Sequence, residues 1–400
     1  MMKILLGLAM VLAAAPLKAA ELQFAESVPE GTVYGSTLAA RPQAVWLEMI
    51  AASSKTLDME QFYIADEKGR ALEPVIAAVK AAAARGVKVR FIADSKMMEE
   101  TGKTLPALKA AGVDARVIDF KKIGGGIQHS KFFVSDGREV YVGSQNFDWR
   151  SLTQVHEIGL RIKSARAAAD FGLVFEGDWA AAGGAGTKRM FPKKRRMSVT
   201  AASPEKASLN GAGVSYSLAF SPEPVIPAGA DSEIRELLAA IAAAKRSIDG
   251  QVMTCSLAEH GSARWAELDS ALRNAAARGV KVRLVFADWA MGGKSDRDIK
   301  ALARTDNITV KISSLPEAPS GFIPYARVEH CKYMVLDGET SYVTTNNWGP
   351  GYFLTTRGAA VFIRGAAGAA ALEDIFSRTW DGPYVQPVDP LKEYQPVKRS

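Results

Sequence analysis

Cysteine and histidine are scarce in this chain of 400 residues, which contains only two of the first and four of the second. A single pair of thiols, Cys255 and Cys331, cannot provide the disulfide framework that stabilises many small secreted domains. Closed zinc sites need four ligands, so two cysteines also exclude a cysteine-rich zinc module. We expect both thiols to be buried as small apolar side chains, with a disulfide between them as the alternative.

Long apolar runs are missing too, apart from one near the start. Residues 4–16 are apolar, follow the basic Lys3, and precede the small residues Ala19 and Ala20. This pattern is typical of a secretory signal peptide and is short for a membrane span. We therefore expect residues 1–19 to be a signal peptide on an exported protein, periplasmic or secreted. A retained N-terminal anchor is the alternative, and the lack of a following cysteine excludes a lipoprotein.

The overall composition is that of an ordinary globular protein. Apolar residues make up 48% of the chain and charged residues 23%, and the length permits two hydrophobic cores. The formal net charge of +7 suits a polyanionic partner without identifying one.

One pattern of histidine, lysine and aspartate occurs twice. The two copies are His129, Lys131 and Asp136, and His330, Lys332 and Asp337. An asparagine follows ten residues after each aspartate, at Asn146 and Asn347. Each copy lies in an apolar run, which predicts a buried strand whose histidine and lysine, two residues apart, face the same way.

The rest of the chain is duplicated as well. Residues 83–94 recur as 276–288, and residues 57–62 match 248–253. Each half is expected to contain a strand, an alanine-rich helix, a second strand, a connection, the motif strand and a further strand. The fold class is therefore α/β, with two similar α/β/α halves at residues 20–180 and 228–400.

Between the halves, residues 181–227 are rich in glycine, proline and basic side chains. We expect this range to be a linker. Its basic run, from Lys188 to Arg196, could contact nucleic acid or an anionic lipid surface, although a solvated connector is the simpler interpretation.

Two imidazoles and two ammonium groups suit the cleavage of a phosphodiester. One histidine attacks phosphorus and the other protonates the leaving oxygen, while the lysines and asparagines hold the remaining oxygens. This chemistry requires no metal and no other cofactor. Since each half supplies one histidine, the active site must lie at the pseudo-twofold seam between the halves. The alternative is that the histidines and lysines are only structural residues of two strands.

The doubled motif resembles the phospholipase D superfamily. More narrowly, residues 143–155 and 330–335 resemble the animal endolysosomal phospholipase D-like 5′-exonucleases and the related poxvirus envelope phospholipase. The resemblance implies a phosphohistidine intermediate, phosphate binding by the lysines and asparagines, and a structural role for three residues near the motifs: Asp136, Asp337 and Ser144.

The two copies differ in their surroundings. In such enzymes an acidic side chain often bonds the back of each catalytic imidazole, and Glu157 is placed to do so for His129. The second half has Thr344, Thr345 and Thr355 at supporting positions and no matching acid. A carboxylate behind an imidazole raises its basicity. We therefore expect His129 to be the nucleophile and His330 the general acid.

Four other side chains have open roles. Trp149 and Tyr352 could stack a base or line an acyl groove, with core packing as the alternative. His156 is expected to be structural, because it should face away from Glu157 on an extended strand. His260 is expected in a loop, where it could line the substrate entrance.

We expect the substrate to be a phosphodiester, either single-stranded nucleic acid or phospholipid. The narrower resemblance favours a nuclease that digests from an end. A phospholipase or phosphatidyl transferase is the second hypothesis, and a catalytically decayed polyanion-binding protein is the third. No obligate protein partner is evident from the sequence.

Overall fold

The computed structural model describes residues 19–187, 190–192, 194–256 and 265–400. Several expectations fall outside these ranges. They concern the signal peptide before residue 19, part of the basic run in the expected linker, and His260. Among the described residues, no helix is both long enough and apolar enough to span a bilayer.

The first half is a mixed sheet covered by helices. Its strand order is β5 (Asp114–Ile118), β4 (Lys88–Asp94), β2 (Thr56–Glu60), β6 (Phe132–Ser135), β7 (Glu139–Gly143), β9 (Glu157–Lys163) and β1 (Ala20–Ser27). The larger helices are α1 (Pro42–Ala52), α2 (Glu73–Ala84), α4 (Leu105–Ala110) and α6 (Ala165–Ala182). Strand β2 is parallel to β4 and antiparallel to β6.

The second half repeats this order. Its sheet runs β19 (Val385–Pro387), β15 (Ile308–Ser313), β14 (Lys281–Ala287), β13 (Ser247–Val252), β16 (Lys332–Leu336), β17 (Thr340–Thr344), β18 (Gly358–Arg364) and β11 (Ala212–Ser221). The larger helices are α7 (Glu233–Ala243), α8 (Glu267–Ala277), α9 (Asp296–Ala303) and α11 (Ala366–Trp380). Strand β13 is parallel to β14 and antiparallel to β16, as expected for a duplicated unit.

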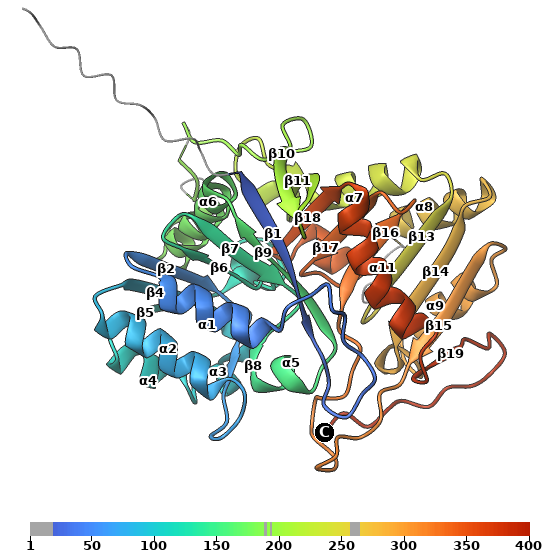
Figure 1. Cartoon of the computed structure of the whole chain (residues 1–400), viewed down its shortest axis with the longest axis horizontal. Coiled ribbons are helices and arrows are strands. Elements are labelled where there is room, and N and C mark those ends of the chain that lie inside the picture. Colours follow the sequence, from blue (N-terminus) through green and yellow to red (C-terminus); the bar gives the residue numbers. More distant parts are fainter. Residues whose placement is uncertain (1–18, 188–189, 193, 257–264) are drawn as a thin grey trace, which may run out of the picture.

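The halves lie side by side and share their largest core (Figure 1). Helices α6 and α11 pack between the two sheets, where Phe171 and Phe175 of one and Leu372 and Phe376 of the other are fully buried. Helices α1, α2 and α4 cover the outer face of the first sheet, and α7, α8 and α9 cover that of the second. The predicted α/β/α halves with a seam between them are confirmed.

The range expected to be a linker departs in part from that prediction. It contains β10 (Glu205–Leu209) as well as β11, and β10 pairs in parallel with β1 and antiparallel with β11. The two sheets are thereby joined edge to edge. The reason is the alternation of buried side chains at Val214, Tyr216, Leu218 and Phe220, which gives β11 an apolar face toward the shared core.

A long connection also ties the halves together. After β15, the chain of the second half crosses onto the first, where Ala318, Ile323 and Ala326 pack into the core beneath α1 and α2. The buried Arg327 donates from Nη1 to the backbone oxygen of Glu30, at 2.9 Å. This connection leads directly into the second motif, so packing against the first half positions it.

The aspartate of each motif fastens a hairpin to the preceding loop. Asp136, between β6 and β7, accepts hydrogen bonds from the backbone N–H groups of Ser54, Lys55 and Thr56 at 3.0, 2.6 and 2.9 Å. These bonds hold the pKa of Asp136 well below its usual range, although burial opposes the shift. Asp337 makes the equivalent bonds in the second half.

We expect Asp136→Asn to lower the free energy of unfolding by about 1–3 kcal/mol, because an amide is a weaker acceptor for three backbone N–H groups. The ionised carboxylate stabilises the fold above its unfolded pKa, and this contribution is lost as pH falls through the lower folded pKa. Urea titrations at neutral and acidic pH measure both effects. Asp337→Asn is the matched variant and should behave alike. A large loss of turnover at unchanged stability would contradict the structural role.

Candidate active site

The two motif histidines lie just before strands β6 and β16 rather than within them. Both side chains are buried, and each following lysine folds back onto its own histidine. Lys131 donates from Nζ to the backbone oxygen of His129 at 2.6 Å, and Lys332 does the same to His330 at 2.9 Å. Histidine and lysine of each copy are therefore brought together, as the spacing predicts.

The backbone of each histidine is held by the opposite half. The N–H of His129 donates to the carbonyl of Arg357 at 3.0 Å, and the N–H of His330 donates to the carbonyl of His156 at 2.9 Å. Arg357 and His156 directly precede β18 and β9 in their own halves. This reciprocal pairing fixes both imidazoles at the seam.

Glu157 does not pair with His129, which corrects the expectation from the sequence. Its carboxylate bonds Nδ1 of His330, in the other half. The cause is the seam pairing: His156 lies alongside Glu329 in a parallel bridge, so the first residue of β9 reaches the second motif. The alternation of the strand then points Glu157 into the site and His156 away from it.

Within the described ranges, no carboxylate bonds the imidazole of His129. Its Nδ1 atom is buried and has no hydrogen-bond partner among the residues that the structure describes. Its ring packs between Phe62 and Tyr352, with centroid separations of 5.0 and 5.2 Å. The counterpart of Glu157 in the second half is Gly358, where a Cβ would lie 2.0 Å from the amide nitrogen of Asn346. An acidic side chain there would displace the buried Asn346 amide, which donates to Ser221 and Glu233.

Burial and the two ammonium groups depress the basicity of both imidazoles. Burial is the main cause that lowers the pKa of His129 well below 6.5, followed by Lys131, Lys332 and His330. Burial and the same two lysines lower the pKa of His330. Burial also lowers the pKa of Lys332 to about 7. A site that disfavours so much positive charge is suited to receive an anion.

Both histidines open into a cavity of about 700 Å³ at the seam. Other expected site residues that line it are Asn146, Glu157, Asn347 and Tyr352. Asn347 donates from its side-chain nitrogen to the Tyr352 hydroxyl at 3.1 Å. The cavity is large enough for a nucleotide-sized group beside the catalytic pair.

Six expected residues do not line this cavity: Lys131, Lys332, Asp136, Asp337, Ser144 and Trp149. Ser144 bonds the backbone N–H and carbonyl of Ile158 at 3.1 and 3.2 Å, so it supports the pairing of β7 with β9. Trp149 is buried in the core of the first half, and the guanidinium of Arg70 lies 4.6 Å from its ring. Core packing is therefore the role that the structure gives Trp149, whereas Tyr352 faces the cavity.

Sequence reasoning missed a polar network on the cavity wall. The Tyr63 hydroxyl donates to Asp148 at 2.8 Å, and Arg150 makes paired bonds to the same carboxylate, including Nη2 to Oδ2 at 2.8 Å. Arg150 also donates from Nη1 to the carbonyl of Pro324 in the second half, at 3.1 Å. The sequence did hold a signal for this network, because Asp148 and Arg150 follow closely after the motif residue Asn146.

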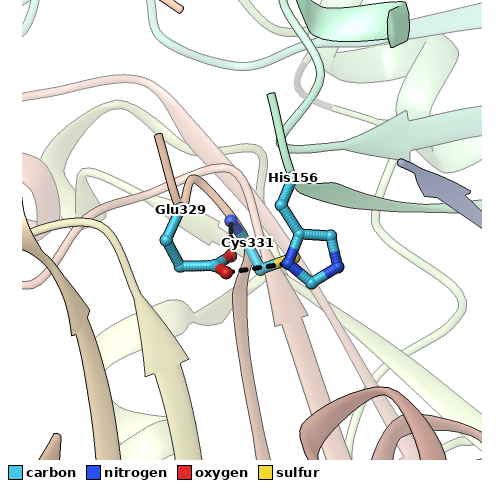
Figure 2. Close-up of side chains that lie close together, drawn as sticks. All are labelled: His156, Glu329 and Cys331. Carbon is cyan, nitrogen blue, oxygen red and sulfur yellow. Dashed lines mark hydrogen bonds and ion pairs between the residues drawn. The ribbon is translucent and has the colours of Figure 1, made fainter. Parts of the chain in front are cut away.

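A second cluster of titratable groups lies behind the second motif. Figure 2 shows His156 beside Glu329 and Cys331, a group whose spacing would suit a metal ion. However, Nδ1 of His156 bonds Glu329 at 2.7 Å and Nε2 bonds Glu26 at 3.1 Å. Burial opposes protonation, but Cys331 and the two carboxylates raise the pKa of His156 well above 6.5. An imidazolium held at both nitrogens has no lone pair for a metal, so this cluster is a structural ion group.

The thiols are not joined: no disulfide links Cys255 and Cys331, and both side chains are buried. This agrees with the interpretation of both as small apolar side chains.

The family model described as the phospholipase D-like domain of cardiolipin synthase matches residues 46–179 and 237–380, one match in each half. The chain belongs to the phospholipase D superfamily. As a member of this superfamily it is a phosphodiesterase, and its two matched segments coincide with the duplicated halves.

Relatives with named activities cover most of the chain. The 5′-3′ exonuclease PLD3 of Bos taurus is 33% identical over 400 residues, which is 92% of this chain and 81% of that protein. The virion nicking-joining enzyme of vaccinia virus, strain Western Reserve, is 33% identical over 402 residues, or 94% and 90% of the two chains. The crystal structure of phosphatidylserine synthase from Haemophilus influenzae is only 10% identical, covers 86% and 85% of the two chains with a TM-score of 0.58, and shows the common fold.

Proposed function

We propose that this phosphodiesterase hydrolyses single-stranded nucleic acid from an end, through a covalent phosphohistidine. The observation that carries the mechanism is the bond between Glu157 and His330 across the seam, opposite a His129 whose Nδ1 has no partner among the described residues. It makes the two imidazoles unequal. The carboxylate fixes the Nδ1–H tautomer of His330 and leaves its Nε2 lone pair directed at substrate.

His330 is therefore the nucleophile in this proposal, in place of His129. Its Nε2 forms a bond to phosphorus while the bond from phosphorus to the leaving oxygen breaks, and His129 gives that oxygen a proton. His129 then removes a proton from water, whose oxygen attacks phosphorus and releases His330. Lys131, Lys332 and the two motif asparagines stabilise the charge on the nonbridging oxygens.

Two observations favour nucleic acid as the substrate. The relatives that span most of the chain are named for acting on nucleic acid, as an exonuclease and as a nicking-joining enzyme. The cavity also presents aromatic side chains beside the motif residues, including Phe62, Tyr63 and Trp289. Bases stack on such rings whatever their sequence.

The test compares substrates in one preparation with EDTA present. We expect release of mononucleotides from a single-stranded oligonucleotide with a free 5′ hydroxyl, slower release from a 5′-phosphorylated one, and no headgroup release from phosphatidylcholine or phosphatidylglycerol vesicles. The double variant His129→Ala/His330→Ala is the control for contaminating nucleases. Activity confined to vesicles would replace this proposal with a phospholipase.

The rate should be highest in acid. The acid limb of kcat/KM reports the loss of neutral His330 and the basic limb reports the loss of protonated His129. Because burial and the lysines lower the pKa of both groups, we expect a bell-shaped profile with its maximum below pH 6.5. Release of mononucleotides from a single-stranded oligonucleotide, whose leaving oxygen needs a proton, measures this profile across a pH series. A maximum above pH 7.5 would contradict the assignment.

We also propose that the protein is exported, on the support of the basic and apolar pattern in residues 1–19. N-terminal sequencing of protein recovered from the periplasm or medium should begin near Ala20. Recovery of an uncleaved chain in the membrane fraction would favour an N-terminal anchor instead.

A further inference from the structure

Aromatic and basic side chains gather outside the mouth of the catalytic cavity. We call five of them the cavity lip: Trp289, Phe322, Tyr325, Lys398 and Arg399. Phe322 and Tyr325 are 43% and 56% exposed, among the most exposed large apolar side chains of the described chain. Trp289 and Tyr325 also line the cavity itself, so the lip is continuous with the active site.

The lip is assembled from three distant segments. Trp289 follows β14, Phe322 and Tyr325 belong to the connection that crosses onto the first half, and the two basic residues lie at the end of the described chain. Figure 1 shows this last segment running beneath the second half to the C mark, near the loops at the foot of the seam.

Specific contacts hold the last segment in place. The backbone N–H of Tyr325 donates to the carbonyl of Arg399 at 2.7 Å, and the Arg399 guanidinium donates to the carbonyl of Trp289. The same guanidinium lies 5.1 Å from the centre of the Trp289 ring. Lys398 Nζ lies 4.5 Å from the centre of the Phe322 ring. Each basic group is thus paired with an aromatic one.

The aromatic part of the lip is fixed relative to the catalytic residues. The bond from Arg150 to the carbonyl of Pro324 joins the connection to the polar wall beside Asn146. Ile323 and Ala326, on either side, are buried in the core of the first half. Tyr325 is therefore exposed, while the backbone before and after it is held in place. Little conformational entropy of this segment is then lost when a ligand binds.

We propose that the lip binds the part of the single-stranded substrate that extends out of the active site. Its bases would stack on Tyr325 and Phe322, and its phosphates would be held by Lys398 and Arg399. This proposal rests on the proposed nuclease function. Exposed rings alternating with cations match the two repeating features of a single strand, its base faces and its phosphates. Continuity with the cavity places that strand next to the scissile phosphodiester.

Kinetics on substrates of two lengths test the proposal. The variants are Phe322→Ala and the double Lys398→Ala/Arg399→Ala. On a single-stranded oligonucleotide of about ten nucleotides we expect KM to rise about 10-fold or more at similar kcat. On bis(p-nitrophenyl) phosphate, which is too small to reach the lip, we expect no change. The slope of log KM against log salt should also fall by about 1.4 in the double variant, as two phosphate contacts are lost.

Lys206→Ala/Lys392→Ala is the matched control. It removes two exposed positive charges that line neither the cavity nor the lip, and it should leave KM within about twofold of the parent. Equal KM values for the control and the lip variants on the oligonucleotide would overturn the lip proposal while leaving the nuclease function intact. Lip variants that lose binding to anionic vesicles, with oligonucleotide KM unchanged, would make the lip a membrane contact. A parent enzyme that cleaves only bis(p-nitrophenyl) phosphate would refute the nuclease function and this inference together.

Discussion

His129→Ala should accumulate a covalent phosphoenzyme on bis(p-nitrophenyl) phosphate, and His330→Ala should form none. Nitrophenolate leaves without a proton, so the first step survives the loss of His129. Hydrolysis of the intermediate does not, because nothing then activates water. Steady-state turnover should fall in both variants by roughly 10³-fold or more, since a general acid or base contributes about 10²–10⁴ and a nucleophile at least as much.

Mass spectrometry of base-quenched protein identifies the adduct, because phosphohistidine survives base and is lost in acid. The expected adduct lies on the peptide that contains His330. Accumulation in His330→Ala on the peptide of His129 would instead restore the assignment that the sequence suggested. The double variant should show neither turnover nor adduct, which separates the reaction from adventitious phosphorylation.

Much of the site could be predicted from the sequence because it depends on residue types repeated at fixed spacing. The paired motifs implied two equivalent strands, and equivalence implied a seam that brings His129 and His330 together. Strand alternation also placed His156 and Glu157 on opposite faces. These are local rules, and the structure agrees with them.

The errors concern relations between the halves. Glu157 lies 28 residues after His129 in its own half, and nothing in that spacing shows that β9 begins beside residue 329. In the linker, glycine, proline and basic residues concealed the alternation of β11, whose partners β10 and β18 lie far apart in the sequence. The lip could not be predicted either, because its three segments are not repeated and meet only in the folded chain.

Glu157→Gln should reduce kcat/KM by about 10²–10⁴-fold while the protein remains folded. Loss of the carboxylate behind a reacting imidazole costs about this much in enzymes that use such a pair, since the tautomer and basicity of the ring both depend on it. Glutamine keeps nearly the same volume in a fully buried position, so packing is preserved. Formation of the phosphoenzyme should be the slowed step. The rate of nitrophenolate release, measured with enzyme in excess of substrate, reports this step.

The pH profile should change in a defined direction. A carboxylate beside His330 favours the imidazolium, so removing its charge lowers the pKa of His330 further. The acid limb of kcat/KM, which reports neutral His330, should then move to lower pH as the maximum falls. A purely structural residue would reduce the rate without moving that limb.

Glu329→Gln provides the matched comparison. Glu329 is also fully buried and precedes His330, but its carboxylate bonds His156 on the far side of the strand. Leaving that imidazolium with one fewer counterion should lower the free energy of unfolding by about 3–5 kcal/mol and leave the acid limb in place. If both variants lose stability alike and neither moves the limb, Glu157 braces the seam and does not act through His330. If only Glu157→Gln moves the limb, Glu157 of the first half acts through His330 of the second, and the division of roles between the two histidines is set across the seam.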